Sequence, residues 1–138
     1  MKLVVHGIPL PQGSKTGFVI GGRAVLTDGK KGPALKEWRQ AIAGEARRWL
    51  QETNKAPLSG PVAMRVTFYL PRPKSAPRRV QYPATKPDLD KLVRSVGDAL
   101  KGLAYEEDSR IVDIDARKRF AIESAPRAEI EIDAVVND

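Results

Sequence analysis

The chain has 138 residues, with 24 lysines and arginines, 17 aspartates and glutamates, one histidine and no cysteine. This length suits one domain that folds around its own hydrophobic core. The absence of cysteine excludes disulfides, thiolate zinc sites and thiol nucleophiles, and the single histidine, His6, excludes multi-histidine metal sites. The sequence has neither a membrane-spanning apolar run nor a secretory signal pattern, so we expect a cytoplasmic protein.

The net charge of +7 is unevenly distributed along the chain. Residues 1–87 carry 16 basic and 4 acidic side chains, a net of +12, whereas residues 88–138 carry 8 basic and 13 acidic ones, a net of −5. A basic region favours a polyanionic partner, and an acidic cluster beside it is consistent with a cation site placed near a nucleic-acid backbone. Ordinary scatter of surface charge is the alternative explanation at this point.

The first seventy residues predict four strands and one helix. β-branched residues at 2–8 predict a strand, and the glycine pair at 21–22 predicts the turn of a hairpin within 17–27. Apolar residues recur at three- and four-residue steps from 34 to 51, which indicates an amphipathic helix. A loop follows, and alternating apolar residues then predict a strand over 61–70.

Residues 71–87 contain five prolines, five basic side chains and no acidic one. Because proline opposes helices and central strands, we expect a long, exposed and flexible loop. One interpretation is a solvated linker. The other is a mobile arm that grips DNA phosphates, with Tyr82 stacking on a base.

The second half predicts a helix, an acidic turn and two strands. The helix covers 88–103, with Asp88 at its N-cap, and is apolar along one side. The turn covers 104–109, and the strands cover 110–121 and 127–136. The element order β-ββ-α-β-α-β-β predicts an α+β fold: a small mixed β-sheet packed with two main helices, in a single domain that spans residues 1–138.

Three aspartates, Asp88, Asp90 and Asp108, flank the second predicted helix. Carboxylate oxygens suit a hard divalent ion such as Mg²⁺, which activates water and neutralises a scissile phosphate. Arg94 lies one helical turn after Asp90 and offers a fixed cation. A helix of about 16 residues separates its ends by about 24 Å. Asp108 therefore meets Asp90 only if the turn folds back, if it arrives from a neighbouring element, or if a dimer partner supplies it.

These residues also have a purely structural interpretation. Aspartates at a helix N-terminus cap the helix and favour its macrodipole. An acidic turn is commonly just solvated, and Arg94 near Asp90 and Asp98 is consistent with a surface ion pair of little energetic weight. The combination with the basic loop favours the metal-site interpretation.

The block KPDLDKLVR at 86–94, the DAL step at 98–100 and the EED triplet at 106–108 resemble the RusA-type Holliday junction resolvases. Weaker matches near the N-terminus, including PQGSK at 11–15, are similar to the phage and prophage branch. The resemblance implies a homodimeric endonuclease that depends on Mg²⁺, with Mn²⁺ as a substitute. Its substrate would be a branched DNA, the four-way junction, resolved by paired symmetric nicks. No organic cofactor and no membrane partner are expected.

The resemblance also assigns roles to residues. The catalytic set would be Asp88, Asp90, Asp108 and Arg94, of which the three aspartates would bind the metal. The family usually has a lysine at the position of Arg94, and because a guanidinium is a poor proton donor we expect phosphate binding there. The DNA would contact basic side chains at Lys15, Arg72, Lys74, Arg78, Arg79, Lys86, Lys91 and Arg94.

Two alternatives belong to other functional classes. One is a catalytically silent DNA-binding module in which the aspartates are helix caps. The other is a metal-dependent nuclease for other branched or flapped DNA. Dependence of cutting on a chelator and on Asp90 separates a nuclease from a silent binder.

Overall fold

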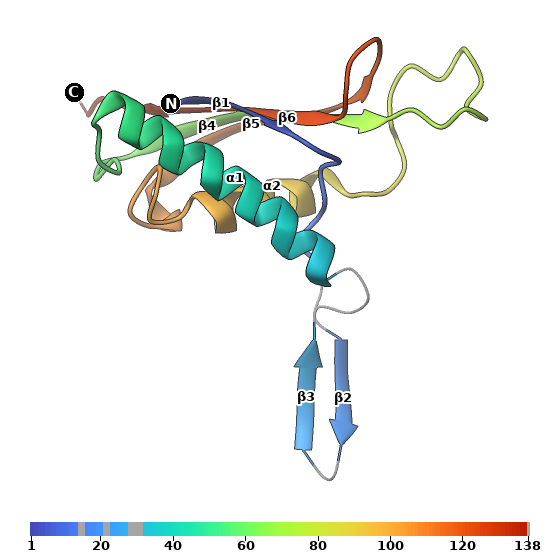
Figure 1. Ribbon diagram of the computed structural model, residues 1–138, viewed down its shortest axis with the longest axis horizontal. Coiled ribbons are helices and arrows are strands. Elements are labelled where there is room, and N and C mark those ends of the chain that lie inside the picture. Colours follow the sequence, from blue (N-terminus) through green and yellow to red (C-terminus); the bar gives the residue numbers. More distant parts are fainter. Residues whose placement is uncertain (14–15, 21–22, 28–31, 138) are drawn as a thin grey trace.

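The computed structural model describes residues 1–13, 16–20, 23–27 and 32–137. A four-stranded mixed sheet forms the centre, in the order β1-β6-β4-β5 (Figure 1). Its strands are β1 (Lys2–His6), β4 (Val62–Pro71), β5 (Ile111–Ala121) and β6 (Arg127–Ala134). β4 is parallel to β5 and antiparallel to β6, which in turn pairs antiparallel with β1. The predicted α+β class and element order are confirmed.

The predicted hairpin forms a separate two-stranded sheet. β2 (Thr16–Ile20) pairs antiparallel with β3 (Arg23–Thr27), and Ile20 stands opposite Arg23. The glycine pair predicted to form the turn lies outside the described residues, as does Lys15.

The hydrophobic core lies between one face of the four-stranded sheet and two helices. α1 (Gly32–Thr53) and α2 (Leu89–Leu100) cover the same face (Figure 1). Alternate residues of β4 point into this core, as the period of two predicted. The central buried side chains are Val62, Met64, Val66 and Phe68 of β4, Trp38 and Ile42 of α1, and Leu92, Val96 and Leu100 of α2.

The segment after β1 is held against both helices. Gly7 has a φ of +134°, and a Cβ there would lie 3.4 Å from the ring of Trp38 on α1. The buried hydroxyl of Ser95 on α2 donates to the carbonyl of Leu10 at 2.6 Å. These contacts fix the start of the chain beside α2.

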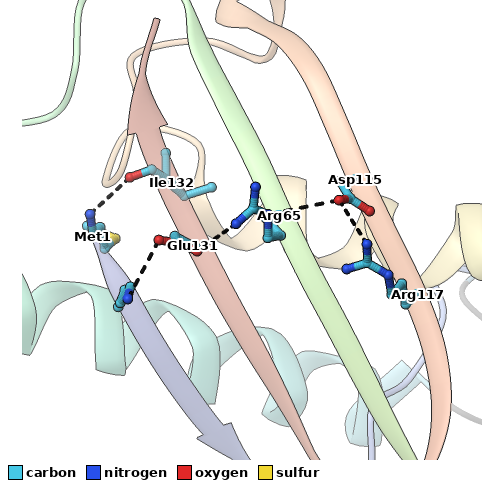
Figure 2. Close-up of polar contacts among 7 residues, drawn as sticks. Met1, Arg65, Asp115, Arg117, Glu131 and Ile132 are labelled. Carbon is cyan, nitrogen blue, oxygen red and sulfur yellow. Dashed lines mark hydrogen bonds and ion pairs between the residues drawn. The ribbon is translucent and has the colours of Figure 1, made fainter.

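The opposite face of the sheet carries a row of alternating charges across all four strands (Figure 2). Lys2 lies 3.8 Å from Glu131, and Glu131 lies 3.7 Å from Arg65. Arg65 lies 3.9 Å from Asp115, which is 3.2 Å from Arg117. Exposed pairs of this kind contribute about 0–1 kcal/mol each to stability. Most of the charge in this row is therefore compensated by its neighbours.

Of the helices in the described part of the chain, none is long and apolar enough to cross a membrane.

Candidate functional site

A cavity of about 660 Å³ opens between α2 and β5. Its walls are mainly apolar side chains: Met64, Leu89, Val93, Ile111, Ile114 and Ala116. Four charged residues also line it: Asp90, Arg94, Asp98 and Asp108. The cavity therefore combines three carboxylates and one guanidinium beside an apolar wall.

Helix α2 contributes three of these charges from one side. Asp90, Arg94 and Asp98 follow one another at four-residue steps, which places them on the same helix face. All three are exposed, and Arg94 has no ion-pair partner among the residues described. The buried face of α2 carries Leu92 and Val96, so the amphipathic pattern of the sequence determines which side chains reach the cavity.

Asp98 was not predicted as a site residue, although its four-residue spacing from Arg94 was the available signal. Its carboxylate lies 3.9 Å from the guanidinium of Arg39 on α1. Arg39 also donates to the side-chain carbonyl of Gln12 at 3.1 Å. A contact between α1 and the N-terminal segment therefore holds this carboxylate at the cavity.

Asp108 reaches the cavity because the chain turns back after α2. The helix ends at Leu100, three residues earlier than the predicted limit of 103. Gly102, with a φ of +80°, donates from its backbone to the carbonyl of Tyr105 at 2.8 Å. Asp108 then begins the short 3-10 helix η2 (Asp108–Arg110), which leads directly into β5. Of the three routes considered from the sequence, the fold-back within one chain is the one observed.

Tyr105 anchors this turn. Its side chain is fully buried, and its hydroxyl donates to the carbonyl of Gly97 at 3.1 Å. Burial raises the pKa of the Tyr105 hydroxyl well above its ordinary value of 10.0, and the negative charges of Asp108 and Asp98 raise this pKa further. The phenol therefore stays neutral and continues to donate its hydrogen bond.

Asp88 lies at the N-cap position of α2, as predicted, but its side chain makes no capping hydrogen bond. The backbone carbonyl of Asp88 accepts from Leu92 at 3.1 Å, while its carboxylate lies 3.7 Å from the ammonium of Lys91. This carboxylate lines a different cavity, next to the basic loop. Asp88 therefore does not line the cavity that Asp90 and Asp108 share.

The carboxylates can be compared with what a divalent metal requires. Within the described ranges, no three histidine, aspartate or glutamate side chains are grouped closely enough to hold one ion. Mg²⁺ in proteins is commonly held by one or two carboxylates, with waters and substrate phosphates completing its shell. Asp90 and Asp108, which line one cavity, match that donor set. The predicted set of three aspartates is not assembled in the single chain.

Lys118 on β5 is a residue that the sequence interpretation missed. Its ammonium donates to the carbonyl of Thr85 at 2.8 Å and to that of Pro87 at 2.9 Å. These bonds fix the end of the basic loop immediately before Asp88. No local pattern indicated this role, because the two segments are more than thirty residues apart in the chain.

The basic loop at 72–87 projects beyond the end of the sheet (Figure 1). Arg72 braces it by donating to the carbonyls of Pro77 and Val80, at 2.7 and 3.4 Å. The remaining cations of the loop, Lys74, Arg78, Arg79 and Lys86, are exposed and have no ion-pair partner in the described chain. The loop therefore offers a group of uncompensated positive charges near the start of α2.

The similarity of this chain to known proteins extends over every part of this site. A family model described as endodeoxyribonuclease RusA matches residues 14–133, a range that includes the basic loop, α2, the turn and β5. The uncharacterized protein YqaN of Bacillus subtilis (strain 168) is 34% identical over 142 residues, covering 96% of this chain and 94% of that protein. The resemblance found in the sequence is thereby confirmed, and the chain belongs to the RusA family of endodeoxyribonucleases.

Proposed function

We propose that this protein is an Mg²⁺-dependent endonuclease that resolves four-way DNA junctions by paired, symmetric nicks. Family membership supports the nuclease class. The observation that carries the site assignment is that Asp108, beyond the far end of α2, lines the same cavity as Asp90 and Arg94. Phosphodiester hydrolysis explains a pair of carboxylates beside an unpaired guanidinium better than helix capping does.

The predicted catalytic residues then have the following roles. Asp90 and Asp108 would hold the metal ion, and Asp88, the third predicted ligand, lies two residues before Asp90 in the chain. A bound ion would activate a water molecule and neutralise negative charge on the scissile phosphate. Arg94 binds a phosphate oxygen and stabilises developing charge, but does not deliver a proton, because its guanidinium stays protonated.

The basic loop supplies affinity for the DNA backbone. Its exposed cations, together with Lys91 and Lys15, contact phosphates irrespective of sequence. The loop follows β4 and leads into α2, so DNA held by it passes the start of the helix that carries Asp90 and Arg94.

We further propose that the active form is a homodimer with β5 at its interface. β5 is an edge strand of the sheet, and its Val112 and Ile114 are 56% and 55% exposed. The unpaired edge of a sheet is a template for pairing with another chain, and exposed apolar side chains there favour it. A two-fold dimer would present one site to each of two opposed strands of a junction, which is what symmetric nicking needs.

We also propose a cytoplasmic location for this nuclease.

The direct test incubates purified protein with a labelled synthetic four-way junction and Mg²⁺, and maps the products on all four strands. We expect nicks at symmetry-related positions in two opposed strands, abolished by EDTA and by Asp90→Asn. Cutting of duplex DNA, or of one strand alone, contradicts the resolvase assignment. Tight junction binding with no cutting under any divalent ion indicates the silent DNA-binding module instead.

A further inference from the structure

A second cavity, of about 540 Å³, lies beneath the basic loop at the N-terminal end of α2. Its wall is largely apolar and includes Ile8, Leu10, Leu70, Val80, Tyr82 and Phe120. Charged side chains that line it are Lys86, Asp88 and Lys91. Its size falls in the range of about 300–1,000 Å³ that is usual for small-molecule sites. An apolar cavity with a few charged residues and two aromatic rings suits a flat, mainly apolar ligand that carries charge at one side.

Both aromatic rings of this cavity have a guanidinium nearby. The Arg119 guanidinium lies 5.1 Å from the centre of the Tyr82 ring, and that of Arg72 lies 5.7 Å from the centre of the Phe120 ring. Tyr82 is 59% exposed, so its ring is not packed into the hydrophobic core. The cavity therefore offers an accessible aromatic surface surrounded by positive charge. That combination complements a nucleotide, whose base is flat and whose phosphate is anionic.

We propose that this cavity receives one unstacked nucleobase of the branched DNA, with Tyr82 as its stacking surface. This inference rests on the proposed function and extends it to the source of selectivity for branched DNA. Taking a base out of a duplex costs free energy, and the cost is smallest for a base that is already unpaired or weakly stacked. The branch point of a junction presents such bases, whereas continuous duplex does not. A base-accepting cavity therefore favours branched DNA over duplex.

The position of the cavity couples base capture to the proposed site of cleavage. Asp88 and Lys91 line the cavity and belong to the same helical start as Asp90. Lys118 fixes the chain at Thr85 and Pro87, two residues that line the cavity immediately before α2. A base held under the loop thus fixes the strand close to the proposed metal ligands.

The test is a double-mutant cycle between the protein and the DNA, measured by binding in EDTA so that no cleavage is needed. One change is Tyr82→Ala, and the other replaces each nucleotide flanking the branch point, in turn, by an abasic residue. We expect wild-type protein to bind at least one abasic junction about tenfold more weakly, because a stacked base is lost. Tyr82→Ala should bind the intact junction about tenfold more weakly and should show no further loss with that abasic junction.

Two further variants control for general effects. Tyr82→Phe keeps the ring and should keep the wild-type preference for junction over duplex. Tyr69→Ala removes a tyrosine that also lies beside an arginine, with Arg127 4.0 Å from its ring centre, but that does not line the cavity. It should leave the abasic effect intact.

Additive losses in the cycle, or equal weakening of junction and duplex binding by Tyr82→Ala, would overturn the inference. Because only binding is measured, these outcomes leave the proposed nuclease activity standing. Conversely, an absence of cleavage with full coupling between Tyr82 and a branch-point base would overturn the proposed function and support this inference.

Discussion

Asp90 and Asp108 are separated by a whole helix in the sequence, and both line one cavity beside Arg94. Arg94 is exposed and has no ion-pair partner in the described chain, so its charge is available to a ligand. That distinguishes it from Arg39 and Arg65, whose guanidinium groups lie within 3.9 Å of carboxylates. At the scale of single residues, the free cation is therefore the feature that most favours a phosphate ligand.

Substitution of Arg94 tests this role. Arg94→Ala should lower the single-turnover rate of junction cleavage about hundredfold, the usual effect of removing one charge-stabilising donor. Arg94→Lys should retain most of the rate, because a cation is kept near the phosphate. The rates are measured at saturating protein, and thermal unfolding checks that both variants fold. A lysine variant as slow as the alanine variant would mean that a bidentate contact is required.

The turn after α2 is the element that completes the cavity, and Tyr105 is its anchor. Tyr105→Phe removes the hydrogen bond to Gly97 and should cost about 0.5–1.5 kcal/mol of stability at neutral pH. Because folding raises the pKa of Tyr105, the folded chain keeps this proton after the unfolded chain has lost it above pH 10. Stability should therefore fall as pH rises above that value, and one proton contributes about 1.4 kcal/mol per pH unit.

In Tyr105→Phe, the part of the stability loss above pH 10 that comes from ionisation of Tyr105 should be absent. The measurement is urea unfolding of both proteins from neutral pH to above pH 10. Parallel curves for the two proteins would show that Tyr105 does not titrate differently in the folded and unfolded chains.

The basic loop is the element that should determine affinity. Each phosphate contact contributes about −0.9 to the slope of log K against log salt concentration on duplex DNA. Replacing Lys74, Arg78 and Arg79 by alanine should therefore flatten this slope by about 2–3 units, with little change in the cleavage rate of the saturated complex. Arg72 is left in place because it braces the loop.

A matched variant removes three cations of α1 instead, at Lys36, Arg47 and Arg48. Its salt dependence should stay close to that of the wild type. An unchanged slope in the loop variant would mean that the loop is only a linker.

The elements differ in how far the sequence predicted them. β4 was predicted because Val62, Met64 and Val66 alternate with more exposed residues, a signal that resides within the strand itself. The end of α2 was placed too late, because the apolar pattern continues through Leu103 into the turn. The backbone N–H of Leu103 bonds to the carbonyl of Leu100 at 2.9 Å and closes a tight turn. Periodicity does not register such a change of backbone path.

The residues of the candidate site also differ in how far local sequence pattern predicts their placement. Asp90, Arg94 and Asp98 lie on one helix, so their spacing alone predicts a shared face. Contacts between distant segments determine three other features of the site. They are the position of Asp108, the ion pair of Asp98 with Arg39 and the hydrogen bonds that Lys118 donates. Sequence pattern carries no direct signal for those contacts. Asp108 stood out from the sequence as part of an acidic turn, and the family resemblance then assigned it to the metal site, whereas nothing in the sequence indicated Lys118.

For the whole molecule, the two edges of the sheet suggest how a dimer would form. The β5 edge adjoins the cavity and exposes Val112, whereas the β1 edge at the other side exposes Val4. Val112→Glu should convert the protein from dimer to monomer in sedimentation equilibrium and should uncouple the two nicks. Val4→Glu introduces the same charge at the other edge and should leave the dimer intact. A Val112→Glu protein that stays dimeric would place the interface elsewhere.

Asp108 and Asp90 together are proposed to form one metal-dependent cleavage site. Single-turnover cleavage of a preassembled four-way junction with Mg²⁺ tests this pairing when wild type, Asp108→Asn and Asp113→Asn are compared. Asp113 is an exposed aspartate of β5 that does not line the cavity. We predict that Asp108→Asn abolishes cleavage while binding the junction as tightly as the wild type, and that Asp113→Asn cleaves normally. Cleavage by Asp108→Asn at the wild-type rate would show that Asp108 is not part of the cleavage site.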